Sequence, residues 1–247
     1  MNSEESLARA REVVNSIMGM REDKPSLVSQ IACDVGAEII EGVIPPGRDL
    51  NTVDLSRRYV TSRTPIREAL LLLEHERLVE IPPRRRPRAM SLDIEEVREI
   101  YRTRAALLEF IAIDVARLAT DAGIAQLREA ADAMGRGAEA NDFNAVFWAN
   151  VQFHEINTCL SRNRTVKRII DSLLLRTLPL RRLSLSQPGR LAESIEDHRR
   201  LVSAYLDRDA NLAAAILRSN HSSALKRLES VLSTETGADR WRDAASR

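Results

Sequence analysis

The chain has 247 residues, of which 44% are hydrophobic and 30% are charged, and its net charge is only +1. This composition excludes a disordered chain, and no apolar run approaches the roughly 18 residues that a membrane span needs. Two cysteines, 126 positions apart, are too few for a disulfide framework. Nine glycines and 4% aromatic residues disfavour a β-rich fold, whereas abundant Leu, Ala, Arg and Glu favour helices. We therefore expect a soluble, cytoplasmic, mostly helical protein without a membrane segment.

The near-neutral total conceals an uneven distribution of charge in the N-terminal third. From Asp34 to Asp54, five acidic residues and one arginine give −4, whereas nine arginines and four glutamates from Ser56 to Arg88 give +5. Arginine offers planar, bidentate donors that suit phosphates, carboxylates and guanine edges. The alternative is a general preference for arginine over lysine along the whole chain, which has only three lysines.

The first elements form a compact helical pattern with a small β-wing. A polar extension, residues 1–24, is expected to be either mobile or a single helix. Pro25 and Ser26 then open a helical pattern with apolar residues every four positions, which stops at Gly42. A short helix follows at 52–58, and another opens at Thr64-Pro65, because Thr is a favoured N-cap and Pro suits the first helical position. With short strands at 78–81 and 88–90, residues 25–90 predict a winged helix-turn-helix.

Beyond Ser91 every segment has a helical pattern, and the breaks between segments are short and polar. Six helices over about 140 residues can form a bundle with its own core. Residues 91–232 therefore predict a C-terminal all-α helical bundle, and the polar residues 233–247 form a tail. The expected helices are 93–119, 124–139, 142–160, 165–185, 191–206 and 211–232.

The most specific local motif opens the second helix of the helix-turn-helix and reads Ser62-Arg63-Thr64-Pro65-Ile66-Arg67-Glu68-Ala69-Leu70. With Pro45-Pro46-Gly47 before it, it closely resembles the DNA-binding domain of the GntR family of bacterial transcription regulators. A helix N-terminus also attracts phosphate through its free N–H groups. The alternative is an ordinary capped helix with surface arginines. We assign DNA contacts to Ser62, Arg63, Thr64, Pro65 and Arg67.

The predicted wing carries Arg84, Arg85 and Arg86, which we expect to enter the minor groove or bind phosphates. The alternative for this segment is a solvated loop. The family usually has glycine in the turn before the recognition helix, after that helix and at the wing tip. Here Val60, Arg77 and Arg86 are assigned to those positions, where glycine would ease a positive φ.

Histidines point to a second site in the helical part. Asn150 and His154 are four residues apart, so both project from one helix face, and His198 and His221 lie on two further predicted helices. This pattern resembles the FCD domain of FadR-type GntR regulators, in which an Asp or Asn and three histidines bind a divalent metal. The resemblance implies zinc, nickel or a similar ion on these four residues. The alternative is that the histidines are satisfied core residues.

The long first bundle helix also looks like the FCD pattern around Tyr101-Arg102-Thr103-Arg104. In that pattern an arginine reaches the ligand cavity, so Arg104 is a candidate effector contact. The alternative for Arg104 is a surface ion pair. The glutamate that is usual shortly afterwards falls at Glu109, one residue later than expected.

These observations predict a transcription regulator and not an enzyme. A homodimer would bind an inverted-repeat operator, and a small effector, a carboxylate, would bind at the metal site in the bundle. A second reading keeps the regulator but makes the metal structural or absent, with a larger or uncharged effector. A third, a metal-dependent enzyme fused to a DNA-binding domain, lacks a clear general acid or base in the sequence.

Overall fold

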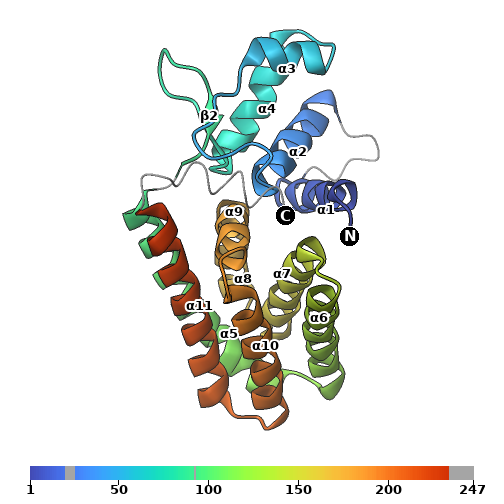
Figure 1. Cartoon of the computed structure of the whole chain (residues 1–247), viewed down its shortest axis with the longest axis vertical. Helices are drawn as coiled ribbons and strands as arrows, with labels where there is room; N and C mark the ends of the chain where they lie inside the picture. The colour runs from blue at the N-terminus through green and yellow to red at the C-terminus, as the bar shows by residue number, and fades with distance from the viewer. Residues whose placement is uncertain (20–25, 92, 234–247) are drawn as a thin grey trace. The chain divides into compact units, whose positions relative to one another are not determined.

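The structure, a computed structural model, describes residues 1–19, 26–91 and 93–233 (Figure 1). The described chain divides into two compact units. The N-terminal unit contains residues 2–19, 26–91 and 172–182, and the C-terminal unit contains Met1, residues 93–171 and residues 183–233. Residues 20–24 of the predicted extension and 234–247 of the predicted tail lie outside the described residues.

The N-terminal unit has the element order of the predicted winged helix-turn-helix, which is confirmed. α2 packs against α1 and α4, and α3 packs against α4. The two strands pair antiparallel with Val79 opposite Ala89, and Asp49 adds an isolated bridge to Arg88. The elements are α1 (Ser3–Ile17), α2 (Leu27–Ile40), α3 (Thr52–Arg58), α4 (Arg63–His75), β1 (Val79–Glu80) and β2 (Arg88–Ala89).

The predicted N-terminal extension forms the helix α1, which is part of the core of this unit. Asn2 caps the helix, and Ala10 and Val14, one turn apart, are fully buried. Gly36 of α2 lies so close to its neighbours that a Cβ there would be 3.2 Å from side-chain carbons of both Val14 and Leu73. The glycine thus lets α1 and α4 approach the same point on α2.

The recognition helix α4 begins earlier than the sequence predicted. Ser62 is its N-cap, with an extended backbone (φ −73°, ψ 169°), and Thr64 and Pro65 already lie in the first turn. The expectation that Thr64 is the N-cap was therefore wrong. Pro65 is tolerated there because the N–H groups of a first turn have no acceptor within the helix.

Three non-glycine residues adopt left-handed backbone angles around the helix-turn-helix and the wing. They are Val60 (φ 50°), Arg77 (φ 58°) and Arg84 (φ 60°). The two positions flanking α4 therefore keep the conformation for which glycine is usual. At the wing the left-handed residue is Arg84 and not Arg86, so that assignment was wrong. A side chain in this region costs roughly 1–2 kcal/mol, which the packing of the unit must offset.

The C-terminal unit is the predicted all-α bundle, and Figure 1 shows α5, α6, α7, α10 and α11 side by side. α5 packs along α11, and α6 packs against α7 and α10. Its apolar core includes Leu108, Ile111, Val115, Phe153 and Tyr205. The helices are α5 (Ile94–Leu118), α6 (Asp121–Glu139), α7 (Phe143–Leu160), α8 (Arg164–Ser172), α9 (Leu174–Leu185), α10 (Arg190–Leu206) and α11 (Ala210–Leu232).

Two helix boundaries in the bundle differ from the prediction. α6 begins at Asp121, because Thr120 accepts a hydrogen bond from the Gly123 N–H at 3.2 Å and caps the helix. Gly123 lies inside α6 and does not interrupt the helix. Because it has no side chain, Leu160 can pack closely against it, and the Leu160 Cδ2 atom would lie only 2.6 Å from a Cβ at position 123. The helix predicted at 165–185 is interrupted at Leu173 and forms α8 and α9, although neither glycine nor proline marks the interruption.

Most of α9 belongs to the N-terminal unit. A buried ion pair links it to α2. Arg182 of α9 lies 3.0 Å from the carboxylate of Glu41, the C-cap residue of α2, and both side chains are only 5% exposed. The Ser6 hydroxyl of α1 donates a hydrogen bond to the same carboxylate at 2.8 Å. Burial lowers the pKa of Arg182, whereas the charge of Glu41 acts in the opposite direction. Three helices thus meet at one buried carboxylate.

Replacing Val60 with glycine is expected to stabilise the protein by about 0.5–1 kcal/mol in urea denaturation. The Val60 side chain is 91% exposed, so the substitution removes backbone strain and few contacts. The matched control is Val53→Gly in α3, which should destabilise by about 1 kcal/mol because glycine is a poor helix former. Equal destabilisation by both variants would contradict the role assigned to the left-handed angle.

Candidate functional site

The N-terminus of α4 presents polar groups outward. Arg63, Thr64 and Arg67 are exposed, and Pro65 is half-buried. The exposed N-cap Ser62 makes no side-chain hydrogen bond to the helix, so its hydroxyl does not occupy the first N–H groups. The five residues predicted to contact DNA therefore lie together at one helix end, where the helix dipole favours phosphate.

Acidic partners are distributed unevenly among the arginines of this unit. Arg58 pairs with Glu38, and Arg88 pairs with Glu80. Within the described chain, by contrast, no acidic partner is found for Arg63 or Arg67. The exposed wing residues Arg84, Arg85 and Arg86 also lack an acidic partner among the described residues.

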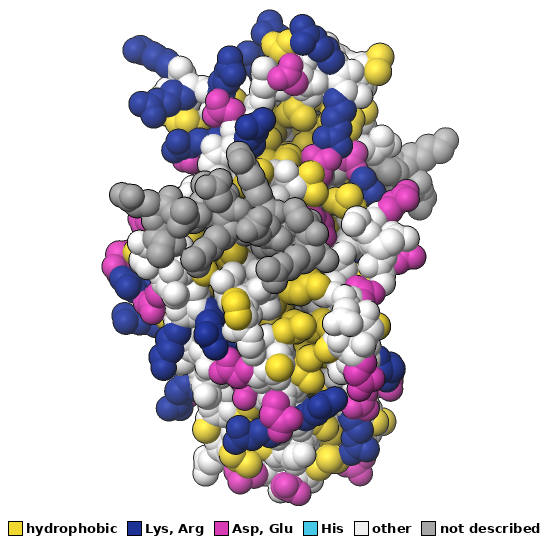
Figure 2. Space-filling view, viewed as in Figure 1, with side chains coloured by type: hydrophobic (Ala, Val, Ile, Leu, Met, Phe, Trp, Pro, Cys, Tyr) yellow, Lys and Arg dark blue, Asp and Glu magenta, His cyan; other side chains and the backbone are white. Residues whose placement is uncertain are grey.

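Figure 2 shows the result on the surface, where Lys and Arg side chains gather over α3, α4 and the wing end of the N-terminal unit. The arginines without an acidic partner among the described residues, which are Arg63, Arg67, Arg84, Arg85 and Arg86, give the recognition helix and the wing a positive face. The arrangement is suited to neutralising DNA phosphates.

The acidic residues of α2 are directed into the helix-turn-helix and support its turn. Asp34 accepts a hydrogen bond from Arg11 of α1 at 2.6 Å and one from the Tyr59 hydroxyl at 3.3 Å. Glu38, one turn later, binds Arg58. The hydrogen bond to Glu38 raises the pKa of Arg58, and burial raises the pKa of Tyr59. The carboxylates of Asp34 and Glu38 thus hold the turn before α4 through Tyr59 and Arg58. Because they are paired inside the unit, they do not offset the arginines on the exposed face of α4.

The structure brings the four predicted metal ligands together inside the bundle. Asn150 and His154 lie one turn apart on α7, His198 lies on α10 and His221 on α11, and all four are buried. The Nε2 atom of His198 is 3.3 Å from the Nε2 atom of His154 and 3.3 Å from the amide nitrogen of Asn150. The rings of His154 and His221 have centroids 5.7 Å apart. Phe153 stacks edge-on against His198 and closes one side.

Backbone carbonyls fix the orientation of two of these imidazoles. The Nδ1 atom of His198 lies 2.6 Å from the carbonyl oxygen of Ser194, and that of His221 lies 3.1 Å from the carbonyl oxygen of Leu217. A carbonyl oxygen only accepts, so Nδ1 carries the proton and Nε2 of the neutral ring presents a lone pair. Histidines that ligate metals are usually held in this way.

The donor set can hold a divalent ion, although the arrangement also has a metal-free interpretation. Two nitrogens bound tetrahedrally to one zinc ion lie about 3.3–3.4 Å apart, which matches the separation of His154 and His198. Rotation of the Asn150 amide would place its oxygen at the same point. Over residues 1–19, 26–91 and 93–233, however, no three His, Cys, Asp or Glu side chains form a ready-made metal group. The 3.3 Å contacts are equally hydrogen bonds between imidazoles and amide.

Arg104 of α5 is a buried cation. It is 2% exposed, and its Nη1 atom has no hydrogen-bond partner in the part of the chain that the structure describes. Burial lowers the pKa of Arg104, and only Tyr101, one turn earlier, acts against that effect. The alternative of a surface ion pair was wrong, because Arg104 is buried, and Glu109 pairs with Arg218. A buried arginine is destabilising without a counter-charge, and the described residues provide none for Arg104.

Sequence reasoning missed Arg190, the first residue of α10. It is also 2% exposed, and its Nη2 atom donates to the carbonyl oxygen of Asn220 at 3.0 Å, next to His221. No sequence signal marks it, because arginines at helix starts are ordinarily exposed.

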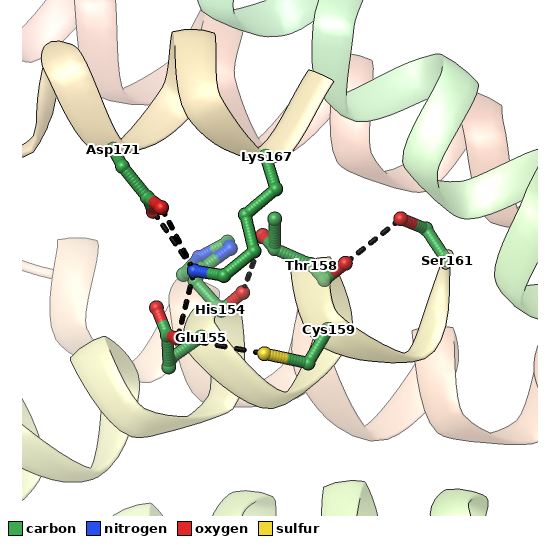
Figure 3. Close-up of polar contacts among 7 residues, drawn as sticks. All are labelled: His154, Glu155, Thr158, Cys159, Ser161, Lys167 and Asp171. Carbon is green, nitrogen blue, oxygen red and sulfur yellow. Dashed lines mark hydrogen bonds and ion pairs between the residues drawn. The ribbon is translucent and has the colours of Figure 1, made fainter. Parts of the chain in front are cut away.

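The outer face of α7 differs from the inner face that carries His154. Figure 3 shows Lys167 of α8 between Glu155 and Asp171, with the Cys159 thiol donating to Glu155. Burial and the neighbouring carboxylate raise the pKa of Cys159, so the thiol stays protonated. This cluster is a satisfied surface network that ties α8 to α7.

Two family models match the chain. The model described as bacterial regulatory proteins, gntR family, matches residues 27–87, and the FCD domain model matches residues 99–221. These ranges fall on the helix-turn-helix with its wing and on the bundle with its buried imidazoles.

Curated relatives and solved structures agree with these matches. The gluconate operon transcriptional repressor of Bacillus licheniformis is 25% identical over 82% of this chain and 85% of its own length. An uncharacterised HTH-type transcriptional regulator of Bacillus subtilis is 29% identical over 66% of this chain and 73% of its own. The solved Escherichia coli McbR/YncC structure covers 84% of this chain and 99% of its own, with a TM-score of 0.68 and 25% identity.

Within residues 1–19, 26–91 and 93–233, no helix is both long enough and apolar enough to cross a bilayer.

Replacing Arg104 with methionine is expected to raise the stability of the ligand-free protein by about 1 kcal/mol or more, because a buried charge without a counter-ion is removed. The same variant should lose its response to an anionic effector. Thermal denaturation with and without effector measures both. The control is Arg218→Met, an exposed ion-pair residue, which should change stability by no more than about 0.5 kcal/mol. A loss of stability in Arg104→Met would contradict the assignment.

Proposed function

Because the chain belongs to the GntR family of transcriptional regulators, with an FCD domain after its winged helix-turn-helix, we propose that a small metabolite bound in the bundle controls its affinity for operator DNA. The chain is a DNA-binding regulator, and the alternative of a fused metal-dependent enzyme was wrong. We also propose that it works in the cytoplasm as a homodimer on an inverted repeat, since a two-fold protein imposes two-fold symmetry on its site.

The single observation that carries the effector proposal is the buried Arg104 guanidinium, which has no counter-charge among the described residues. Tyr101, one turn before Arg104 on α5, has its ring centroid 6.4 Å from that of His221. A small carboxylate would supply the missing counter-charge in a site that excludes water, where charge-assisted hydrogen bonds are strongest. The Bacillus licheniformis relative is named for a gluconate operon, and gluconate is a carboxylate, which supports the same class.

We further propose that a divalent ion, zinc, nickel or similar, is held by Asn150, His154, His198 and His221. Such an ion would supply open coordination positions for a carboxylate oxygen. The chain's own contribution is orientation, because carbonyl oxygens hold the rings of His198 and His221 with their Nε2 lone pairs available. Asn150 provides a neutral donor where other members have a carboxylate.

A second version of the function has a specific observation in its favour. The contacts of His198 with His154 and Asn150 are of hydrogen-bond length without any ion. In that version the metal is structural or absent, and the bundle binds a larger or uncharged effector.

Operator recognition is tested with Arg67→Ala. We expect binding to a selected operator to weaken about 5- to 150-fold, because each base contact contributes about 1–3 kcal/mol. Arg85→Ala should instead weaken binding to all sequences alike and reduce the slope of log K against log salt by about one. The control is Arg9→Ala on α1, whose exposed side chain pairs with Glu12. Unchanged operator binding by Arg67→Ala, measured by fluorescence anisotropy, would show that the recognition helix is misassigned.

The metal proposal is tested by elemental analysis of protein purified without an affinity tag or chelator, followed by zinc or nickel add-back. We expect about one ion per chain and a rise in melting temperature on add-back. His198→Gln should lose both, whereas His75→Gln, an exposed residue, should lose neither. If no divalent ion changes the melting temperature of the native protein, the metal-free version is correct.

A further inference from the structure

Arg190 is a buried arginine whose hydrogen-bonding capacity is only partly used. Its Nε and Nη1 atoms have no hydrogen-bond partner within the described ranges, and the nearest carboxylate oxygen, from Glu193, is 3.9 Å from Nη1. The residue before it, Gly189, is the N-cap of α10 and has no side chain to offer. A fully buried guanidinium with two unused donor groups is costly unless a ligand completes it.

Arg190 lies beside the imidazole cluster. Asn220, whose carbonyl oxygen it binds, directly precedes His221 on α11. The phenol of Tyr101, which neighbours His221, acts electrostatically on both Arg104 and Arg190. Two guanidinium groups from different helices, α5 and α10, therefore flank the same tyrosine next to the proposed effector site.

The surrounding carboxylates do not neutralise both cations. Glu193 is 3.9 Å from Arg190 and also 3.9 Å from Arg227, so its charge is shared. Asp197 accepts a hydrogen bond from the Asn220 side chain at 2.9 Å. Arg104 has no carboxylate partner among the residues described. A ligand with one carboxylate at the imidazoles and Arg104 would leave the free donors of Arg190 unfilled.

We propose that Arg190 is a second anion-binding residue of the effector site and that the effector is a small dicarboxylate. One acidic group would bind at the imidazole cluster and Arg104, and the other would accept hydrogen bonds from Nε and Nη1 of Arg190. This inference rests on the proposed function insofar as it takes the bundle interior to be the effector site. It adds the chemical class of the effector, a dicarboxylate, and names Arg190 as the residue that selects this class.

The test is isothermal titration calorimetry with matched pairs of probes, succinate against butyrate and glutarate against valerate, on the zinc-supplemented full chain. We expect the better dicarboxylate to bind at least about ten-fold more tightly than its monocarboxylate partner, since a charge-assisted contact contributes about 1.5–3 kcal/mol. Arg190→Met should abolish this preference by weakening the dicarboxylate alone. Arg190→Lys, which keeps the charge, should retain part of it.

The control variant is Arg218→Met, which removes an exposed arginine of α11 and should keep the wild-type preference. If Arg190→Met does not fold, as judged by circular dichroism, the wild-type preference and the Arg190→Lys titration still decide. The proposal is overturned if the wild type binds no dicarboxylate or prefers the monocarboxylate. It is also overturned if an Arg190 variant weakens both probes equally, which would indicate a structural role.

The calorimetry needs no DNA and therefore separates this inference from the proposed function. A dicarboxylate preference that depends on Arg190, together with operator binding that no ligand changes, would support the site and contradict the control of transcription. Operator release by a monocarboxylate alone would support the control and overturn the role of Arg190.

Discussion

The rest of the bundle depends on the burial of polar and cationic side chains in an apolar helical core. Three imidazoles, an amide and two guanidinium groups lie among helices whose other buried residues are mostly Leu, Ile, Val and Ala. Each buried polar group must find a partner or destabilise the fold by several kcal/mol. Backbone carbonyl oxygens accept hydrogen bonds from the imidazoles of His198 and His221, and His198 also contacts His154 and Asn150. Among the described residues, the chain leaves Nη1 of Arg104 and both Nε and Nη1 of Arg190 without hydrogen-bond acceptors, and this imbalance is the basis of the binding site proposed for the bundle interior.

In the N-terminal unit, Asp34 and Glu38 of α2 are partly buried acidic groups, and each of them has a partner. There the carboxylates of Asp34 and Glu38 are turned inward and are completed by arginine and tyrosine, which stabilises the turn before α4. The exposed arginines at the N-terminal end of α4 and on the wing have no acidic partner among the described residues. Internal pairing of the acids thus produces a positive face on a protein whose net charge is nearly zero.

Backbone strain accompanies this arrangement. Val60 and Arg77 hold left-handed angles on either side of the recognition helix, so the geometry for which the family uses glycine is kept without it. The helix α9 adds a further restraint, because Arg182 near its end completes the buried carboxylate of Glu41 at the end of α2. The helix-turn-helix is therefore stabilised by residues distant from it in the sequence.

The sequence by itself determined most of the secondary-structure elements and the family. Helical periodicity, caps such as Asp93 and the motif from Ser62 to Leu70 are local signals, and local signals predict helices, turns and family. Tertiary structure alone decided which polar residues are buried. The family resemblance singled out Arg104, but nothing in the sequence marks Arg190 as buried, and nothing at Leu173 indicates that the helix is interrupted there. Burial and missing counter-charge depend on neighbours from other helices, whereas the carbonyl oxygens that orient His198 and His221 lie one turn earlier on the same helices.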